Sequence, residues 1–225
     1  MDNIRAVLFD LDGTIYCGSK LIPGADRVVN KYRQEGKKIF FMTNNSTKSR
    51  KQIWEKLTGM GLECSYDEVY TSGYAAALYA KQMGYHTVYI MGSKALEEEF
   101  GELDITVSDQ AEVVIVGYDM TFDYQKLTDA LQVAFHADKI IACNKERHYP
   151  GENAKRMPGC GAMVGALEGS LGREVDYSVG KPNPLLMEII CKDNDLRPEE
   201  VVVVGDTYES DIVMAQNYGS SAVYI

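Results

Sequence analysis

Four carboxylates stand in two short motifs near opposite ends of the chain. Asp10 and Asp12 lie two residues apart in Asp-Leu-Asp-Gly-Thr, and Asp206 and Asp211 lie in Gly-Asp-Thr-Tyr-Glu-Ser-Asp. Carboxylates that are brought together repel one another unless a cation neutralises them. The motifs contain neither His nor Cys, and hard oxygen ligands favour Mg²⁺ over zinc. The acids therefore predict a magnesium site, if the fold brings the two motifs together.

Two further motifs offer groups that hold an anion. Thr43, Asn44 and Asn45 supply a hydroxyl and amide side chains, and Ser46 is a good N-cap residue ahead of a periodic segment. We expect a helix to begin there and to present free backbone N–H groups to a phosphate. Lys181 stands in Val-Gly-Lys-Pro-Asn-Pro, directly before another segment of helical period. Its rigid neighbours would hold an ammonium group at a defined place.

Short apolar runs that predict β-strands precede three of these motifs. Asp10, Thr43 and Asp206 each follow such a run, directly or after one glycine. Ligands of open α/β sheets bind at the carboxyl ends of parallel strands, so these side chains are expected to converge on one crevice. The expected strands are residues 6–9, 38–42, 87–91, 113–116, 139–142, 201–204 and 222–225.

Stretches of helical period alternate with the expected strands. Apolar residues recur with helical spacing in 25–32 and 127–134, and Ser72 and Asp123 are N-cap candidates like Ser46. This alternation indicates an α/β fold with a doubly wound parallel sheet.

The four motifs resemble, in order and character, those of the haloacid dehalogenase superfamily of phosphohydrolases. The long insertion between the Thr43 and Lys181 motifs, with Pro-Gly-Cys-Gly-Ala at 158–162, is similar to the α/β-capped subclass IIA branch. That branch includes p-nitrophenyl phosphatase-like, phosphoglycolate and pyridoxal phosphatases. The resemblance implies a Rossmann-like core formed by residues 1–80 and 179–225, with a smaller α/β cap domain inserted at 81–178.

The resemblance also implies a role for each acid. Asp10 would be the nucleophile that forms an aspartyl-phosphate, and Asp12 the general acid and then the general base. Mg²⁺ would be held by Asp10, by the backbone carbonyl of Asp12 and by Asp206, with Asp211 in support through water. Chemical reasoning agrees, because a carboxylate nucleophile divides hydrolysis into two easier displacements.

The remaining motifs would hold the substrate. Thr43, Asn44, Asn45 and Lys181 are the expected phosphate-binding residues, since most of the catalysis of phosphoryl transfer comes from offsetting charge on the phosphoryl oxygens. The substrate is expected to be a small phosphorylated metabolite. The family's cap loop usually reads Thr-Asn with an acid two positions on, and this chain has Cys-Asn-Lys-Glu-Arg-His-Tyr at 143–149. We therefore do not transfer the family's preferred substrates.

Two alternatives share the expected sheet. A phosphoacceptor domain of the receiver type also gathers acids, a Thr and a Lys at strand ends, but it needs neither a second acid at Asp12 nor a long insertion. A dinucleotide-binding oxidoreductase would need G-x-G-x-x-G after the first strand, where this chain has Asp-Leu-Asp-Gly. We interpret the glycines at 92 and 117 as turns of the cap.

Charge and composition exclude several other classes. The formal charge of −10 argues against a general nucleic-acid binder, although residues 1–80 hold 11 basic and 9 acidic residues. The sequence has no apolar run long enough to span a membrane and no signal peptide at its start, so we expect a cytoplasmic protein. Five cysteines, an odd number without a C-x-x-C pair, argue against a disulfide framework. A homodimer through the cap is a further implication of the resemblance.

Overall fold

The computed structural model describes residues 3–150 and 155–225. The chain divides into two compact units. Unit 1 comprises Met1–Thr43, Arg50–Thr71 and Lys181–Ile225, and unit 2 comprises Asn44–Ser49 and Ser72–Gly180. The expected core and cap boundaries stay a prediction. The compact units differ from them in assigning residues 44–49 and 72–80 to the unit that holds the middle of the chain.

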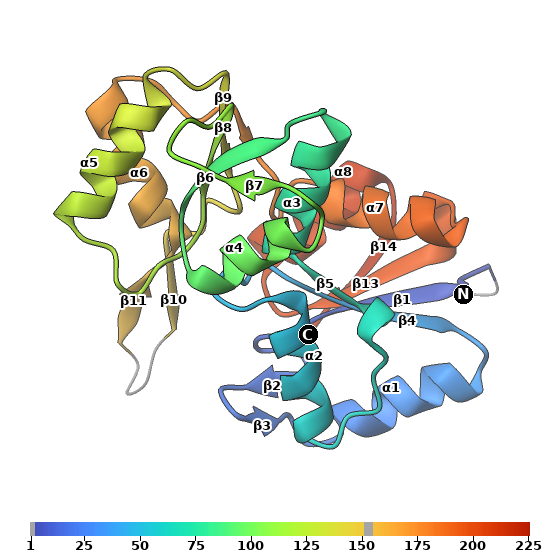
Figure 1. The fold of residues 1–225 in the computed structure, drawn as a ribbon. Coiled ribbons are helices and arrows are strands. Elements are labelled where there is room, and N and C mark those ends of the chain that lie inside the picture. The colour runs from blue at the N-terminus through green and yellow to red at the C-terminus, as the bar shows by residue number, and fades with distance from the viewer. Residues whose placement is uncertain (1–2, 151–154) are drawn as a thin grey trace. The chain divides into compact units, whose positions relative to one another are not determined.

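Unit 1 is built on a five-stranded parallel sheet in the order β14-β13-β1-β4-β5. Its adjacent strands β1 and β13 come from opposite ends of the chain, as their blue and red colours in Figure 1 show. The strands are β1 (Ala6–Asp10), β4 (Lys38–Thr43), β5 (Val69–Thr71), β13 (Val201–Gly205) and β14 (Ser221–Tyr224). Every residue of β1 is buried, as expected of a parallel strand that is covered on both faces. The expected doubly wound α/β sheet is confirmed.

Helices cover both faces of this sheet (Figure 1). On one face, Val29, Ile53 and Leu57 pack with alternate residues of β1 and β4 in one buried cluster. The smaller elements include a hairpin of β2 and β3, which follows the Asp10 motif. The helical elements are α1 (Ala25–Gln34), α2 (Arg50–Gly59), η1 (Tyr66–Glu68), α7 (Leu185–Asn194), η3 (Pro198–Glu200), η4 (Tyr208–Ile212) and α8 (Val213–Tyr218), and the hairpin strands are β2 (Tyr16–Cys17) and β3 (Lys20–Leu21).

Unit 2 holds a second five-stranded parallel sheet, in the order β12-β9-β8-β6-β7. Asp123 is the N-cap of α5, as expected, and its Oδ1 accepts a 2.9 Å hydrogen bond from the Lys126 N–H. The helices are α3 (Ser72–Gln82), α4 (Lys94–Gly101), α5 (Tyr124–Ala134) and α6 (Cys160–Leu171). The strands are β6 (Thr87–Met91), β7 (Thr106–Val107), β8 (Val113–Val116), β9 (Lys139–Ala142), β12 (Tyr177–Ser178) and the antiparallel pair β10 (His148–Pro150) and β11 (Arg156–Pro158).

The expected helix start at Ser46 is wrong, because α2 begins at Arg50. The Ser46 hydroxyl accepts a 2.9 Å hydrogen bond from the backbone N–H of Tyr118 in unit 2. Its carbonyl accepts a 3.2 Å bond from the Ser93 hydroxyl. These tertiary bonds use the groups that would have capped a helix, so the expected anion site at a helix start does not form at Ser46.

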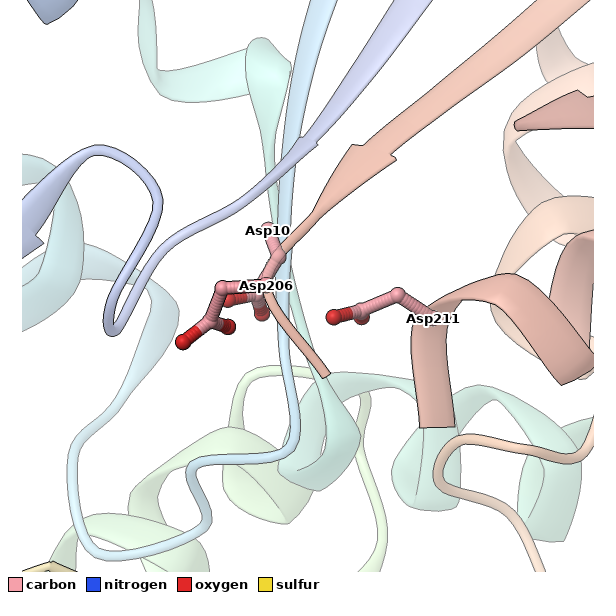
Figure 2. A group of neighbouring side chains, drawn as sticks. All are labelled: Asp10, Asp206 and Asp211. Carbon is pink, nitrogen blue, oxygen red and sulfur yellow. The ribbon is translucent and has the colours of Figure 1, made fainter. Parts of the chain in front are cut away.

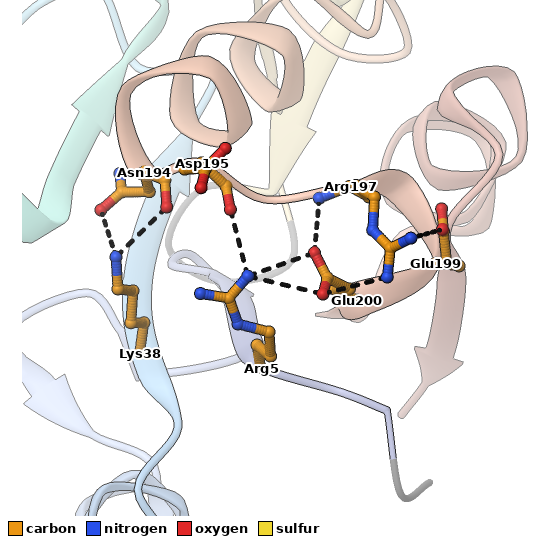
Figure 3. Close-up of polar contacts among 7 residues, drawn as sticks. All are labelled: Arg5, Lys38, Asn194, Asp195, Arg197, Glu199 and Glu200. Carbon is orange, nitrogen blue, oxygen red and sulfur yellow. Dashed lines mark hydrogen bonds and ion pairs between the residues drawn. The ribbon is translucent and has the colours of Figure 1, made fainter.

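A polar network lies at the amino-terminal edge of the unit 1 sheet (Figure 3). Arg5 precedes β1, and its Nη1 donates to the Asp195 carbonyl at 3.1 Å and to Glu200 at 3.4 Å. Lys38 begins β4 and donates to Asn194 at the end of α7. The network therefore ties two strand starts to the helix that precedes β13.

Two further observations concern the part of the chain that the structure describes. No helix there combines the length and the apolar character needed to cross a bilayer. The cysteines at 17, 64, 143, 160 and 191 are all free thiols.

Candidate active site

Three of the four predicted carboxylates meet at the carboxyl edge of the unit 1 sheet (Figure 2). Asp10 is the last residue of β1, Asp206 directly follows β13, and Asp211 lies in the turn η4. One carboxylate oxygen from each lies within 4.8 Å of the others. Adjacent parallel strands that come from opposite ends of the chain have their carboxyl ends side by side here, which is where α/β sheets bind ligands. Oxygen donors of this kind fit Mg²⁺.

Two glycines permit this close approach. Gly13 has φ +91°, and a Cβ there would lie 2.0 Å from Oδ2 of Asp206. A Cβ on Gly205 would lie 2.4 Å from the Asp211 carboxyl group. Any side chain at either position would displace a carboxylate of the group.

Lys181 supplies positive charge to the same group. Its ammonium contacts Oδ1 of Asp10 and lies 2.6 Å from Oδ1 of Asp211, and the residue is almost fully buried. Lys181 is the first residue of unit 1's last segment, directly before cis-Pro182 and a turn that leads into α7. The sequence motif around Lys181 thus brings its ammonium to acids from two other motifs.

Burial and charge shift the pKa values of this group. Burial raises the pKa of Asp10 to about 7, with Lys181 opposing the shift and Asp211 adding to it. The pKa of Asp206 is also raised, by burial and by the charge of Asp211. Burial opposes the charge on Lys181, but attraction by Asp10 and Asp211 outweighs it and raises the Lys181 pKa. The lysine is therefore a fixed cation, while the carboxylates favour a further positive charge.

Asp12 lies outside the group of three carboxylates. Its side chain is exposed, and its Oδ2 accepts a 3.0 Å hydrogen bond from the phenol of Tyr16. The side chain of Asp12, which was expected beside the other three carboxylates, is therefore not a member of their group. Tyr16 has no place in the sequence-based site, although an aromatic residue four positions after Asp12 is visible in the sequence.

Thr43 lies at the same sheet edge as Asp10. It is buried at the end of β4, and Met42 before it pairs with Asp10 on β1. Thr43 itself pairs with Thr71 of β5. The expected position of Thr43 at a strand end beside Asp10 agrees with the structure.

Asn44 and Asn45 belong to unit 2. The Asn44 carbonyl accepts 2.7 Å bonds from the Ser72 hydroxyl and from Nδ2 of Asn144, and Nδ2 of Asn44 donates to Oε1 of Glu146 at 2.8 Å. Oδ1 of Asn45 accepts bonds from the backbone N–H groups of residues 47 and 48, both at 3.0 Å. The side-chain oxygen of Asn45 thus shapes the turn after β4.

The sequence shows Asn144 with an acid, Glu146, two positions on. Only the structure shows that both side chains form hydrogen bonds with Asn44. Oδ1 of Asn144 also accepts a 3.0 Å bond from the Glu146 N–H, so the two residues form one small loop around Asn44. The preceding Cys143, where the family has Thr, is buried and leaves this arrangement in place.

Family models describe both ends of the chain. A haloacid dehalogenase-like hydrolase model matches residues 7–106, and a second model of HAD-like hydrolases matches residues 178–225. The sugar-phosphatase AraL of Bacillus subtilis (strain 168) is 33% identical over 223 residues, which span 97% of this chain and 82% of that protein.

Solved structures show the same fold. The p-nitrophenyl phosphatase of Archaeoglobus fulgidus superposes with a TM-score of 0.94 at 32% identity, covering 99% of this chain and 86% of that one. The glycerol phosphate phosphatase of Mycobacterium tuberculosis, solved in complex with magnesium, gives 0.90 at 29% identity, covering 99% of this chain and 68% of that one. The receiver and oxidoreductase alternatives are thereby set aside. The chain belongs to the haloacid dehalogenase-like hydrolases, in their α/β-capped subclass IIA branch, and is a phosphoric monoester hydrolase.

Proposed function

We propose that this chain is a Mg²⁺-dependent phosphatase of small phosphorylated metabolites that works through an aspartyl-phosphate on Asp10. The observation that carries the proposal is the group of buried Asp10, half-buried Asp206 and buried Asp211 at the carboxyl edge of a doubly wound sheet, with Lys181 in contact with Asp10 and Asp211. Such a site offers a nucleophile, a cation and oxygen ligands together.

In the first step, a carboxylate oxygen of Asp10 forms a bond to phosphorus as the bond to the leaving oxygen breaks. Asp12 gives its proton to that leaving oxygen. Water then attacks the phosphorus and gives a proton to Asp12, and the bond between Asp10 and phosphorus breaks to release inorganic phosphate. Asp12 therefore returns to its starting protonation state after each turnover.

Charge compensation supports both steps. Lys181 would offset the negative charge of the phosphoryl oxygens, and the Thr43 hydroxyl would donate to one of them. Mg²⁺, held by Asp10, Asp206 and the Asp12 carbonyl with Asp211 in support, would supply Lewis-acid stabilisation and keep Asp10 ionised. The raised pKa of Asp10 supports this assignment, because the nucleophile needs added positive charge to be fully ionised at neutral pH.

The substrate class rests on the relatives. Their names specify a sugar phosphate, glycerol phosphate and p-nitrophenyl phosphate, which are all small phosphate monoesters. We infer that this chain accepts substrates of the same size, and that unit 2 acts as the cap that excludes water from the reaction.

The proposal is tested with purified protein, p-nitrophenyl phosphate and a panel of sugar and glycerol phosphates. We expect phosphate release that stops with a chelator and returns with Mg²⁺. Asp10→Asn is expected to lower kcat by at least about 10⁴-fold, as loss of a covalent nucleophile does elsewhere. Asp193→Asn, which changes an exposed acid on α7, is the matched control and should keep full activity. Turnover by a folded Asp10→Asn variant would contradict the nucleophile assignment.

A further inference from the structure

The phenol of Tyr16 is the group that holds the side chain of Asp12. Asp12 is exposed, so its carboxylate would otherwise be free to change rotamer, whereas Tyr16 is only 1% exposed. The Tyr16 hydroxyl donates to Oδ2 of Asp12 at 3.0 Å. The Tyr16 side chain is already held in place by burial, whereas the exposed Asp12 side chain can still change rotamer. The hydrogen bond between them therefore restricts Asp12.

Backbone hydrogen bonds connect Tyr16 to the residues on either side of Asp12. The Gly13 N–H donates to the Tyr16 carbonyl at 2.8 Å, and the Tyr16 N–H donates to the Leu11 carbonyl at 3.1 Å. Residues on both sides of Asp12 are thus bonded to Tyr16. The ring of Tyr16 also belongs to the buried cluster that contains Phe9 and Leu57, so its position is set by the core of unit 1.

A lysine side chain also contacts the Tyr16 ring. Nζ of Lys56 on α2 lies 3.3 Å from the centroid of the Tyr16 ring, a cation–π contact. The contact holds the ring between the core and a charged side chain.

We propose that Tyr16 is a positioning residue that fixes Asp12 for proton transfer to the leaving group. The inference rests on the role given to Asp12 under the proposed function. With Oδ2 engaged by the phenol, Oδ1 is the oxygen that carries the proton and delivers it to the leaving oxygen. Loss of the phenol would leave the Asp12 carboxyl group in place but in several orientations.

Leaving groups of different basicity separate this role from a structural one. An alkoxide leaving group needs a proton, whereas p-nitrophenolate is a weak base that departs without one. Because kcat/KM includes only steps up to formation of the aspartyl-phosphate, it is not affected by the later attack of water. Tyr16→Phe should lower kcat/KM about tenfold for the best alkyl phosphate substrate and less than about twofold for p-nitrophenyl phosphate.

The matched control is Tyr32→Phe, which removes a phenol from another tyrosine of unit 1 whose ring packs on Phe9. It should change neither value. A Tyr16→Phe variant that melts like the wild type and loses the same factor on both substrates, or loses nothing on either, would overturn the inference. Absence of phosphate release by the wild type would instead contradict the proposed function.

Lys56 gives a second test if Tyr16→Phe does not fold. Lys56→Met keeps most of the aliphatic stem but removes the cation from the Tyr16 ring, and it should cause the same selective loss on alkyl phosphates. Lys51→Met, at an exposed position of the same helix, is its control. Equal kcat/KM values for Lys56→Met and Lys51→Met on the alkyl phosphate would overturn the inference.

Discussion

A buried carboxylate group is stable only where positive charge is held among its members. Asp10 and Asp211 are both buried, and Lys181 contacts both. The lysine lowers the pKa of Asp10, but burial raises it by more, and the charge of Asp211 adds to the rise. The remaining negative character is what a divalent cation would neutralise.

Gly13 is the residue on which the position of Asp206 depends most directly. Gly13→Ala should destabilise the protein by about 1–2 kcal/mol through its left-handed backbone, and should also displace the Asp206 carboxylate that its Cβ would overlap. We expect Mg²⁺-dependent kcat/KM to fall about 100-fold, because small displacements of catalytic groups are costly. Thermal unfolding and steady-state kinetics measure the two effects.

A glycine at position 18 provides a control that separates backbone strain from the overlap with the Asp206 carboxylate. Gly18 has φ +60° and no atom within 4 Å of the position of a Cβ. Gly18→Ala should therefore lose stability but keep its activity. Equal kinetics of the two variants would contradict the role given to Gly13.

At the scale of elements, the site depends on the strand order of unit 1. β1 and β13 are adjacent in the sheet, and their register pairs Phe9 with Val204, so Asp10 and Asp206 leave the sheet close together. The network in Figure 3 holds the opposite edge of the same strands. The carboxylates of the candidate site at one edge and the ion pairs at the other thus lie at the ends of the same two strands.

Glu200 is the acid at the centre of that network. The backbone N–H and the guanidinium of Arg197 lower its pKa, with the Arg5 charge adding to the effect. A lowered pKa in the folded state contributes stability above the unfolded pKa, which is lost as pH falls through the folded value. Glu200→Gln should lower the melting temperature at pH 7, and its difference from the wild type should shrink as the pH is lowered below about 4.

Glu199→Gln is the matched control for this prediction. Glu199 lies in the same turn and pairs with Arg197 at 3.3 Å, but its side chain is 58% exposed. Exposed pairs contribute little, so its melting temperature should stay near that of the wild type at both pH values. A pH-independent difference between Glu200→Gln and the wild type would contradict the linkage.

At the scale of the whole molecule, the segment that follows β4 is bonded to residues far along the chain. Asn44 and Ser46 bond to residues of unit 2, and the bond between Asn44 and Glu146 joins positions 102 residues apart. Residues 44–49 are therefore part of unit 2, whereas Thr43 belongs to unit 1.

Glu146 tests whether this attachment matters for phosphate binding. Glu146→Ala removes the acceptor of the Asn44 amide, a bond worth about 1 kcal/mol, and should raise KM for phosphate esters about fivefold. Inhibition by inorganic phosphate should weaken by a similar factor. Glu174→Ala, at an exposed position of unit 2, is the control. Unchanged phosphate inhibition in Glu146→Ala would contradict a role for Asn44 in binding phosphate.

Local pattern was sufficient for much of the fold. Strand β8 is a fully buried apolar run, and β6 and β9 are apolar after their first residues, Thr87 and Lys139; the expected bounds of all three are those observed. The start of α5 was predicted from Asp123 because an N-cap bond spans only a few residues. Short strands such as β7 and β12 escaped prediction, because two residues carry no periodicity and only their neighbours in the sheet define them.

The sequence by itself determined the motifs, the α/β class and the family, because each rests on residue types at short spacing. Only the tertiary structure decided which acids meet, since the contact between Lys181 and Asp10 joins residues 171 positions apart. It also decided that Ser46 bonds to Tyr118 rather than capping a helix, and that Asp12 accepts a hydrogen bond from Tyr16 outside the group of three carboxylates. Such hydrogen bonds depend on where the core places each donor, and no local pattern contains that information.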